Sequence, residues 1–192
     1  MKQPVFTVVA GANGCGKSTL TRGNPSDFSK LPLLDPDAIA NTIRFLKDEA
    51  SALAAGREVL QKVGLYIETR QSFAVETTLS GKNYLRVIAD ARRIGFQVVL
   101  VYIGTERVEI NLARIANRVL NGGHDVPEDD VRRRYIRSFR HLPQAIALAD
   151  GVLLFDNSTD LGYQLVAVGE ENLEWMDPLP EWAESLRRHL GR

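Results

Sequence analysis

The 192-residue chain has little cysteine, no net charge and no long apolar run. Cys15 is its only cysteine, which excludes a disulfide framework and a cysteine-rich zinc site. Because 24 basic residues balance 24 acidic ones, the overall charge indicates neither nucleic-acid nor membrane binding. No apolar run approaches the length of a membrane-spanning helix, and the first residues lack a signal-peptide pattern. We therefore expect a cytoplasmic protein with neither a membrane nor a nucleic acid as its partner.

The segment from Gly11 to Ser18 reads GANGCGKS and fits the pattern G-x-x-x-x-G-K-[ST] of a phosphate-binding loop. An apolar, β-branched run at 5–9 precedes it and predicts a buried strand, while 19–22 fits a first helical turn. In such a loop Lys17 lies between the β- and γ-phosphates, and the Ser18 hydroxyl binds Mg²⁺. The sequence therefore predicts ATP and Mg²⁺ as cofactors. The predicted nucleotide contacts are Gly11, Ala12, Asn13, Gly14, Cys15, Gly16, Lys17, Ser18 and Thr19.

Strand-like and helix-like segments alternate along the rest of the chain. This alternation predicts a three-layer α/β fold of the phosphate-loop type, with a mostly parallel sheet and helices on both faces. The length suits one domain over 1–192. The predicted strands are 5–9, 30–34, 73–75, 97–103 and 151–155, followed by a hairpin at 163–168 and 173–175. The predicted helices are 38–49, 51–71, 83–94, 106–120, 127–148 and 181–190.

Acidic residues follow the second and third predicted strands, at the sheet edge where ligands bind in open α/β folds. Asp37 belongs to the run LDPD, and it can either cap the next helix or take the proton of an acceptor hydroxyl. Glu76 and Thr78 come from the run ETT, which can either face water or bind hydroxyl and amide groups of a substrate. We predict that all three contact the substrate.

Two arginine-rich helical segments flank the glycine-rich stretch at 122–123. Their guanidinium groups suit bidentate contact with phosphates, so we expect a helical lid at about 114–137. Several of these arginines can equally belong to solvent-exposed helix faces, and no aromatic residues alternate with them as base stacking would require. Asn157, after the last core strand, is placed to contact the nucleotide base. The C-terminal hairpin and helix are expected at about 163–190.

Five segments together resemble the zeta-toxin-like family of phosphate-loop kinases over about residues 5–158: GANGCGKST, LDPD, FAVETTLSG, NRVLNGGHDVPEDDVRRRYIRS and LFDNS. The resemblance implies that Asp37 is the general base, that Glu76 and Thr78 contact a sugar nucleotide, and that Arg118 contacts the ATP phosphates. It also implies phosphorylation of the 3′-hydroxyl of UDP-N-acetylglucosamine, and an antitoxin protein as partner.

The sequence departs from the family pattern at two cationic positions. His124 stands where the family has a second lid arginine, and Arg133 or Arg134 is the expected substitute. Ser80 stands where an arginine often lies near the substrate. We predict Lys17, Asp37, Arg118 and Arg134 as the catalytic residues of a small-molecule kinase. The alternatives are a nucleoside or polynucleotide kinase of the same fold, and an ATP-dependent switch whose output is the binding of a partner.

Overall fold

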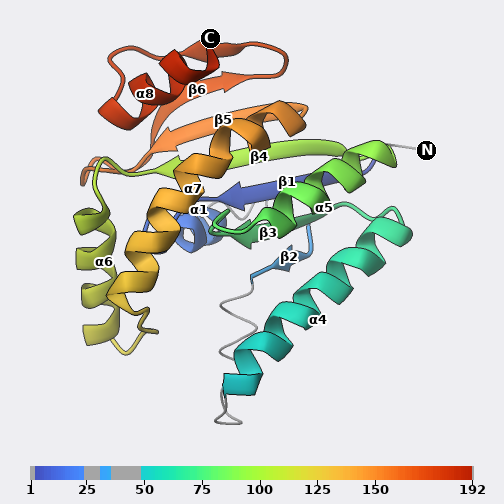
Figure 1. The fold of residues 1–192 in the computed structure, drawn as a ribbon, viewed down its shortest axis with the longest axis horizontal. Helices are drawn as coiled ribbons and strands as arrows, with labels where there is room; N and C mark the ends of the chain where they lie inside the picture. The colour runs from blue at the N-terminus through green and yellow to red at the C-terminus, as the bar shows by residue number, and fades with distance from the viewer. Residues whose placement is uncertain (1–2, 24–30, 36–48, 192) are drawn as a thin grey trace.

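A seven-stranded sheet runs through the molecule in the order β2-β3-β1-β4-β5-β6-β7 (Figure 1). The computed structural model describes residues 3–23, 31–35 and 49–191. The first five strands of this order pair in parallel, and β6 and β7 are antiparallel. The mostly parallel sheet is therefore confirmed. The strands are β1 (Val5–Ala10), β2 (Leu33–Leu34), β3 (Phe73–Thr77), β4 (Gln97–Gly104), β5 (Gly151–Asp156), β6 (Gln164–Gly169) and β7 (Leu173–Trp175).

Helices lie on both faces of the sheet, as predicted, but they divide unequally. The main core packs α4, α5, α7 and α8 against one face, and Figure 1 shows α5 and α7 crossing it. On the other face, Leu20 of α1 packs against Val9 and Val101. None of the described helices is both long and apolar enough to cross a membrane. The helices are α1 (Lys17–Gly23), α4 (Glu49–Glu68), α5 (Lys82–Arg93), α6 (Val108–Leu120), α7 (Glu128–Leu148) and α8 (Glu181–Leu190).

The alternation of side chains along the central strands decides which residues enter each layer. In β1, Phe6 and Val8 point into the main core, whereas Val9 points to the α1 side. β4 repeats the pattern, with Leu100 in the main core and Val101 on the α1 side. Because parallel strands buried on both faces need apolar residues at every position, these strands read as continuous apolar runs.

Several element boundaries differ from the predicted ones by one to three residues. β3 continues to Thr77 because parallel pairing with β1 extends that far, so Glu76 lies inside the strand rather than after it. β2 has only two residues among those described, where a strand over 30–34 was predicted. α4 ends at Glu68, before the predicted residue 71, because Arg70 adopts a left-handed conformation (φ 52°) that stops the helix. The helix predicted at 38–49 lies outside the described residues apart from Glu49, which begins α4.

Candidate active site

The phosphate loop connects β1 to α1 at the carboxyl edge of the sheet. Its first residue donates a backbone hydrogen bond from the Gly11 nitrogen to the Thr77 carbonyl oxygen (3.2 Å), which ties the loop to the end of β3. Gly16 has a φ of 108°, which side chains disfavour, and a Cβ there would lie 2.9 Å from the Tyr163 hydroxyl. Both the backbone conformation and the close neighbour therefore require glycine at this position.

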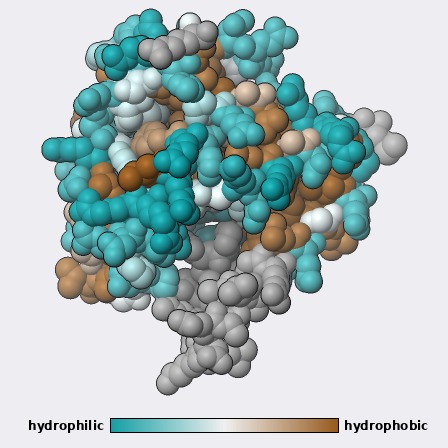
Figure 2. Space-filling view, in the orientation of Figure 1, coloured by the Kyte–Doolittle hydropathy of each residue, from teal (hydrophilic) through white to brown (hydrophobic). Residues whose placement is uncertain are grey.

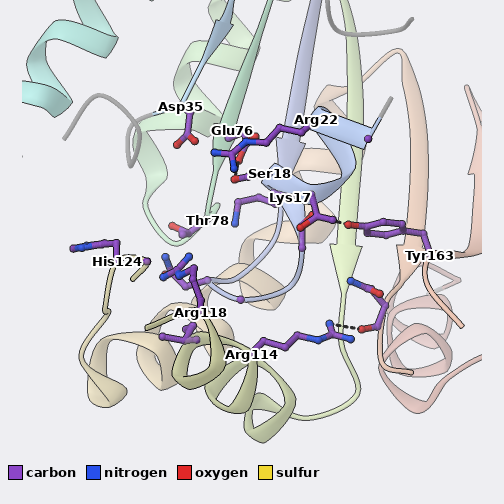
Figure 3. A pocket seen from close by; sticks show the side chains of 18 of the residues that line it. Lys17, Ser18, Arg22, Asp35, Glu76, Thr78, Arg114, Arg118, His124 and Tyr163 are labelled. Carbon is purple, nitrogen blue, oxygen red and sulfur yellow. Dashed lines mark hydrogen bonds between the residues drawn. The ribbon is translucent and has the colours of Figure 1, made fainter. Parts of the chain in front are cut away.

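Lys17 begins α1 and folds back over the loop. Its Nζ donates to the carbonyl oxygens of Gly11 (2.8 Å) and Ala12 (3.1 Å), and its side chain is buried. Figure 3 shows Lys17 and the neighbouring Ser18 facing the cavity beside the loop. The ammonium group is thus already at the loop, where incoming phosphate oxygens can replace the two carbonyls as its partners.

Glu76 of β3 receives hydrogen bonds from two hydroxyl groups of α1. Ser18 Oγ donates to Oε2 and Thr21 Oγ1 donates to Oε1, each over 2.7 Å. Only 3% of Glu76 is exposed, so this carboxylate is held by paired donors inside the molecule. Because the Ser18 proton is directed at Glu76, the lone pairs of its oxygen are left for a cation.

These groups fit a Mg²⁺ ion held mainly by phosphate oxygens and water. In the described part of the chain, no cluster of three or more histidine, cysteine, aspartate or glutamate side chains forms a metal cage. Mg²⁺ typically binds through one or two protein oxygens plus substrate phosphates. Ser18 Oγ, with Glu76 behind it, matches that donor set.

Side chains from the end of β5 onward hold the phosphate loop from its other side. Asn157 Nδ2 donates to the Cys15 carbonyl oxygen (2.8 Å), and the Tyr163 hydroxyl donates to the Gly16 carbonyl oxygen (2.7 Å). Arg114 of α6 donates in turn to the Asn157 carbonyl oxygen (2.7 Å). Three segments far apart in the sequence therefore meet at this loop, and Asn157 connects two of them.

The helices α6 and α7 reach the loop through Asn13. Asn111 Nδ2 donates to the Asn13 backbone oxygen (2.7 Å), and Arg134 Nη1 donates to Asn13 Oδ1 (3.1 Å). Arg134 is also paired with Asp130, one turn earlier in α7 (3.2 Å). Asn13, which is buried, thus joins the loop to both helices.

The arginines of α7 lie in different environments. Arg134 faces the cavity beside the loop. Arg132 pairs with Glu109 and Glu128 on the outer surface, and Arg133 pairs with Asp130 while 51% of its side chain is exposed. In Figure 2, hydrophilic side chains predominate in the region of α6 and α7, although a smaller hydrophobic patch is also visible there.

The cavity has a volume of about 1310 Å³ and collects most of the predicted site residues (Figure 3). Gly11, Ala12 and Cys15 are buried and do not belong to its lining. Asp37 lies outside the described residues, whereas Asp35, two positions earlier, lines the cavity. The predicted residues in the lining are Asn13, Gly14, Gly16, Lys17, Ser18, Thr19, Glu76, Thr78, Arg118, Arg134 and Asn157, and His124 joins them.

Sequence reasoning missed several residues of this cavity. Tyr84 of α5 lines it, and burial, followed by the nearby Asp35 carboxylate, raises the pKa of Tyr84 to about 12. Arg22 and Tyr163 line it as well. No local pattern marks these residues, because each reaches the cavity only through the packing of its element. At Cys15, burial raises the pKa of the thiol, so it stays protonated and fills space under the loop.

The parallel sheet, the phosphate loop after β1 and the helix pair α6–α7 define the fold of a phosphate-loop kinase. The family model of the zeta toxins matches residues 1–173, and the chain belongs to this family. The resemblance inferred from the sequence is thereby confirmed.

One sequence relative and two solved structures of similar fold are compared with this chain. An uncharacterized protein of Haemophilus influenzae is 42% identical over 125 residues, covering 65% of this chain and 88% of that protein. The structure from the PezAT chromosomal toxin-antitoxin system of Streptococcus pneumoniae superposes with a TM-score of 0.66 at 18% identity, over all of this chain and 87% of that one. The AvrRxo1-ORF1:-ORF2 structure with ATP gives a TM-score of 0.73 at 16% identity, over 98% of this chain and 64% of that one. Together with family membership, the fold supports a kinase-like, ATP-using phosphotransferase.

Proposed function

We propose that this protein is an ATP- and Mg²⁺-dependent kinase of the zeta-toxin type that phosphorylates a hydroxyl group of a sugar nucleotide such as UDP-N-acetylglucosamine. The observation that carries the proposal is the shape of the cavity. One end is the phosphate loop with Lys17 and Ser18, and the cavity continues past Glu76 to Thr78, Tyr84 and Asp35. A cavity that extends beyond the loop suits a reaction between two bound substrates.

At the donor end, this chain's own residues bind and orient the triphosphate. Backbone N–H groups of the loop and the N-terminus of α1 surround the β-phosphate. Lys17 exchanges its bonds to Gly11 and Ala12 for phosphate oxygens. The Ser18 hydroxyl, which donates a hydrogen bond to Glu76, would hold a Mg²⁺ ion through its oxygen. The chemistry that Mg²⁺ supplies when bound is neutralisation of charge on the β- and γ-phosphate oxygens.

Arg118 and Arg134 stabilise charge on the phosphoryl group during transfer. Both line the cavity, one from α6 and one from α7. Arg134 takes the place of the second lid arginine of the family, because His124 stands at that sequence position. The hydrogen bond to Asn13 keeps the Arg134 guanidinium beside the loop before the substrate arrives, which lowers the cost of orienting it.

At the acceptor end, Asp37 removes the proton of the attacking hydroxyl, and Thr78 and Glu76 orient the substrate. The Thr78 hydroxyl shares a hydrogen bond with Ser80 (2.8 Å), so it faces the substrate as a donor or an acceptor. Both oxygens of Glu76 already accept a hydrogen bond, which leaves their second lone pairs for the substrate. With Ser80 replacing an arginine, Arg22 supplies a cation near this end of the cavity (Figure 3).

We also propose an antitoxin protein as the partner that controls the kinase. The support is family membership together with the PezAT neighbour, which comes from a toxin-antitoxin system. Co-expression with the product of a neighbouring gene tests this directly. Relief of growth inhibition and co-purification of the two chains are the expected results.

The test of the kinase activity uses γ-labelled ATP, Mg²⁺ and the purified chain with sugar nucleotides, nucleosides and oligonucleotides supplied separately. Label on a sugar nucleotide, lost when Lys17 is replaced by Ala, is the expected result. Label on a nucleoside or an oligonucleotide end would move the proposal to another acceptor class. Label found only in free phosphate would overturn the kinase proposal in favour of an ATP-dependent switch.

A prediction for the acceptor end is that Asp37→Asn retains ATP binding but lowers kcat by on the order of 10²-fold or more, because the hydroxyl keeps its proton. Calorimetric titration with ATP and a single-turnover assay separate the two effects. Asp35→Asn is the matched comparison, since it changes a carboxylate two residues away. Unchanged transfer by the Asp37 variant would remove this residue from the mechanism.

A further inference from the structure

The C-terminal helix α8 lies beyond the residues matched by the zeta toxin family, yet it contacts the ends of β4 and β5. Trp182 in its first turn is only 8% exposed. Its ring packs on the end of β4 so closely that a Cβ on Gly104 would lie 2.6 Å from it. Its indole Nε1 donates to Asp156 Oδ1 over 2.8 Å, which joins α8 to the end of β5.

Asp156 organises the turn that follows β5. Its Oδ1 also accepts from the Ser158 hydroxyl (2.7 Å), and its Oδ2 accepts from the Ser158 nitrogen (3.1 Å). The Ser158 hydroxyl accepts in turn from the Glu106 nitrogen (2.8 Å). The carboxylate is buried, so each donor that reaches it offsets part of the cost of removing its charge from water.

Asn157, between these two residues, carries the connection to the phosphate loop. Its nitrogen donates to the Gly104 carbonyl oxygen (3.0 Å), which fixes its backbone against β4. Its side chain then donates to the Cys15 carbonyl oxygen (2.8 Å). A continuous chain of hydrogen bonds and covalent neighbours therefore runs from Trp182 through Asp156 and Asn157 to the phosphate loop.

We propose that Trp182 is a positioning residue for the donor nucleotide, acting through Asp156 and Asn157 on the peptide group of Cys15. That peptide belongs to the part of the loop whose N–H groups face the phosphates. A shift of its carbonyl oxygen would therefore change the direction of the neighbouring backbone N–H groups. The inference rests on the proposed function, because it assumes that the loop binds a triphosphate. It assigns a role in nucleotide binding to a helix outside the family-matched region.

The experiment compares the wild-type chain with Trp182→Phe, which keeps an aromatic ring but removes the N–H donor together with the second ring of the indole. Trp175→Phe is the matched control, because Trp175 lies in β7 at the far edge of the sheet. Titration calorimetry measures the Kd of Mg-ATP and of Mg-tripolyphosphate well below the melting temperature of each variant. Tripolyphosphate is included because it reaches the loop without a base or a ribose.

Trp182→Phe is expected to weaken both ligands by at least about fivefold, as loss of one hydrogen bond to a charged group predicts, while Trp175→Phe stays within about twofold of wild type. Binding of both ligands within about twofold of wild type by Trp182→Phe would overturn the inference. Weakened ATP binding with unchanged tripolyphosphate binding would also overturn it, because the effect would not pass through the loop.

Asp156→Asn gives a second measurement if Trp182→Phe fails to fold, because it keeps the shape and an oxygen acceptor but removes the charge. It is expected to weaken both ligands in the same proportion. Wild-type protein that binds neither ligand would contradict the proposed function itself. If the wild-type protein binds both ligands and the Trp182 and Asp156 variants bind them equally well, only the positioning role is contradicted.

Discussion

At the scale of single residues, Glu76 is the group whose interpretation changes most between sequence and structure. Its place after an apolar run predicts a substrate contact, and that remains a prediction. The structure adds that both carboxylate oxygens are occupied by the Ser18 and Thr21 hydroxyls. We therefore predict that Glu76 acts on the phosphate loop and on a bound Mg²⁺ ion as well as on an acceptor.

We predict that Glu76→Gln raises the Mg²⁺ concentration needed for half-maximal activity by about tenfold, because an amide no longer attracts the Ser18 proton as a carboxylate does. Initial rates measured over a Mg²⁺ series at saturating ATP check this. Thr21→Val is the control, since it removes the other hydroxyl and leaves Ser18 paired. An unchanged Mg²⁺ requirement with a raised KM for the acceptor would assign Glu76 to the acceptor alone.

Arg134 and Arg133 offer a matched pair of neighbouring arginines in different environments. Arg134 faces the cavity and bonds Asn13, whereas Arg133 pairs with Asp130 at the surface. Arg134→Ala is expected to lower kcat by on the order of 10²-fold, because it removes the guanidinium whose positive charge stabilises the negative phosphoryl group in the transition state. Arg133→Ala should leave kcat close to wild type. Equal losses in the two variants would show that the role of Arg134 is not specific.

At the scale of elements, the turn between α6 and α7 places Arg118. A Cβ on Gly123 would lie 2.4 Å from Arg118 Cγ and 2.8 Å from its carbonyl oxygen. We predict that Gly123→Ala displaces Arg118 and raises the KM for ATP by about tenfold. Gly81→Ala, where an added Cβ has nothing within 4 Å, is the control in the same kinetic assay. A KM for ATP equal to that of the wild type in the Gly123 variant would mean that Arg118 is not displaced from the phosphates by the added Cβ.

The phosphate loop and the order of strands and helices can be predicted from the sequence because each depends on residues close together in the chain. The glycines, Lys17 and Ser18 stand in one run, and apolar periodicity marks β1, β4 and β5. The end of β3 cannot be predicted in this way, since pairing with β1 decides it. Tyr163 was missed as a partner of the loop for the same reason: it lies 147 residues from Gly16, and no local pattern links them.

At the scale of the whole molecule, one buried and three partly buried tyrosines set the response to alkaline pH. Burial raises the pKa of Tyr84 and of Tyr135 to about 12, and burial raises the pKa of Tyr102 and Tyr163 as well. The unfolded chain releases these protons near a pKa of about 10, while the folded chain keeps them. The unfolded state then binds fewer protons, so stability is complete below about pH 10 and falls between about pH 10 and 12.

Urea unfolding measured at steps from about pH 9 to pH 11 checks this prediction, and the free energy of unfolding should fall over that range. Tyr135→Phe should make the fall shallower, because one of the groups that titrate is removed. An unchanged slope in this variant would show that Tyr135 loses its proton equally in the folded and unfolded states.

The distance along the chain between the phosphate loop and its supports also has a consequence for synthesis. The side chains that hold the loop come from 98 to 147 positions later in the chain. At about 5–20 residues per second, a ribosome needs roughly 7–30 seconds to travel from Gly16 to Tyr163. During that interval the nascent chain carries the loop sequence without the groups that shape it. The phosphate loop therefore acquires its full set of supports only after Tyr163 has been synthesised.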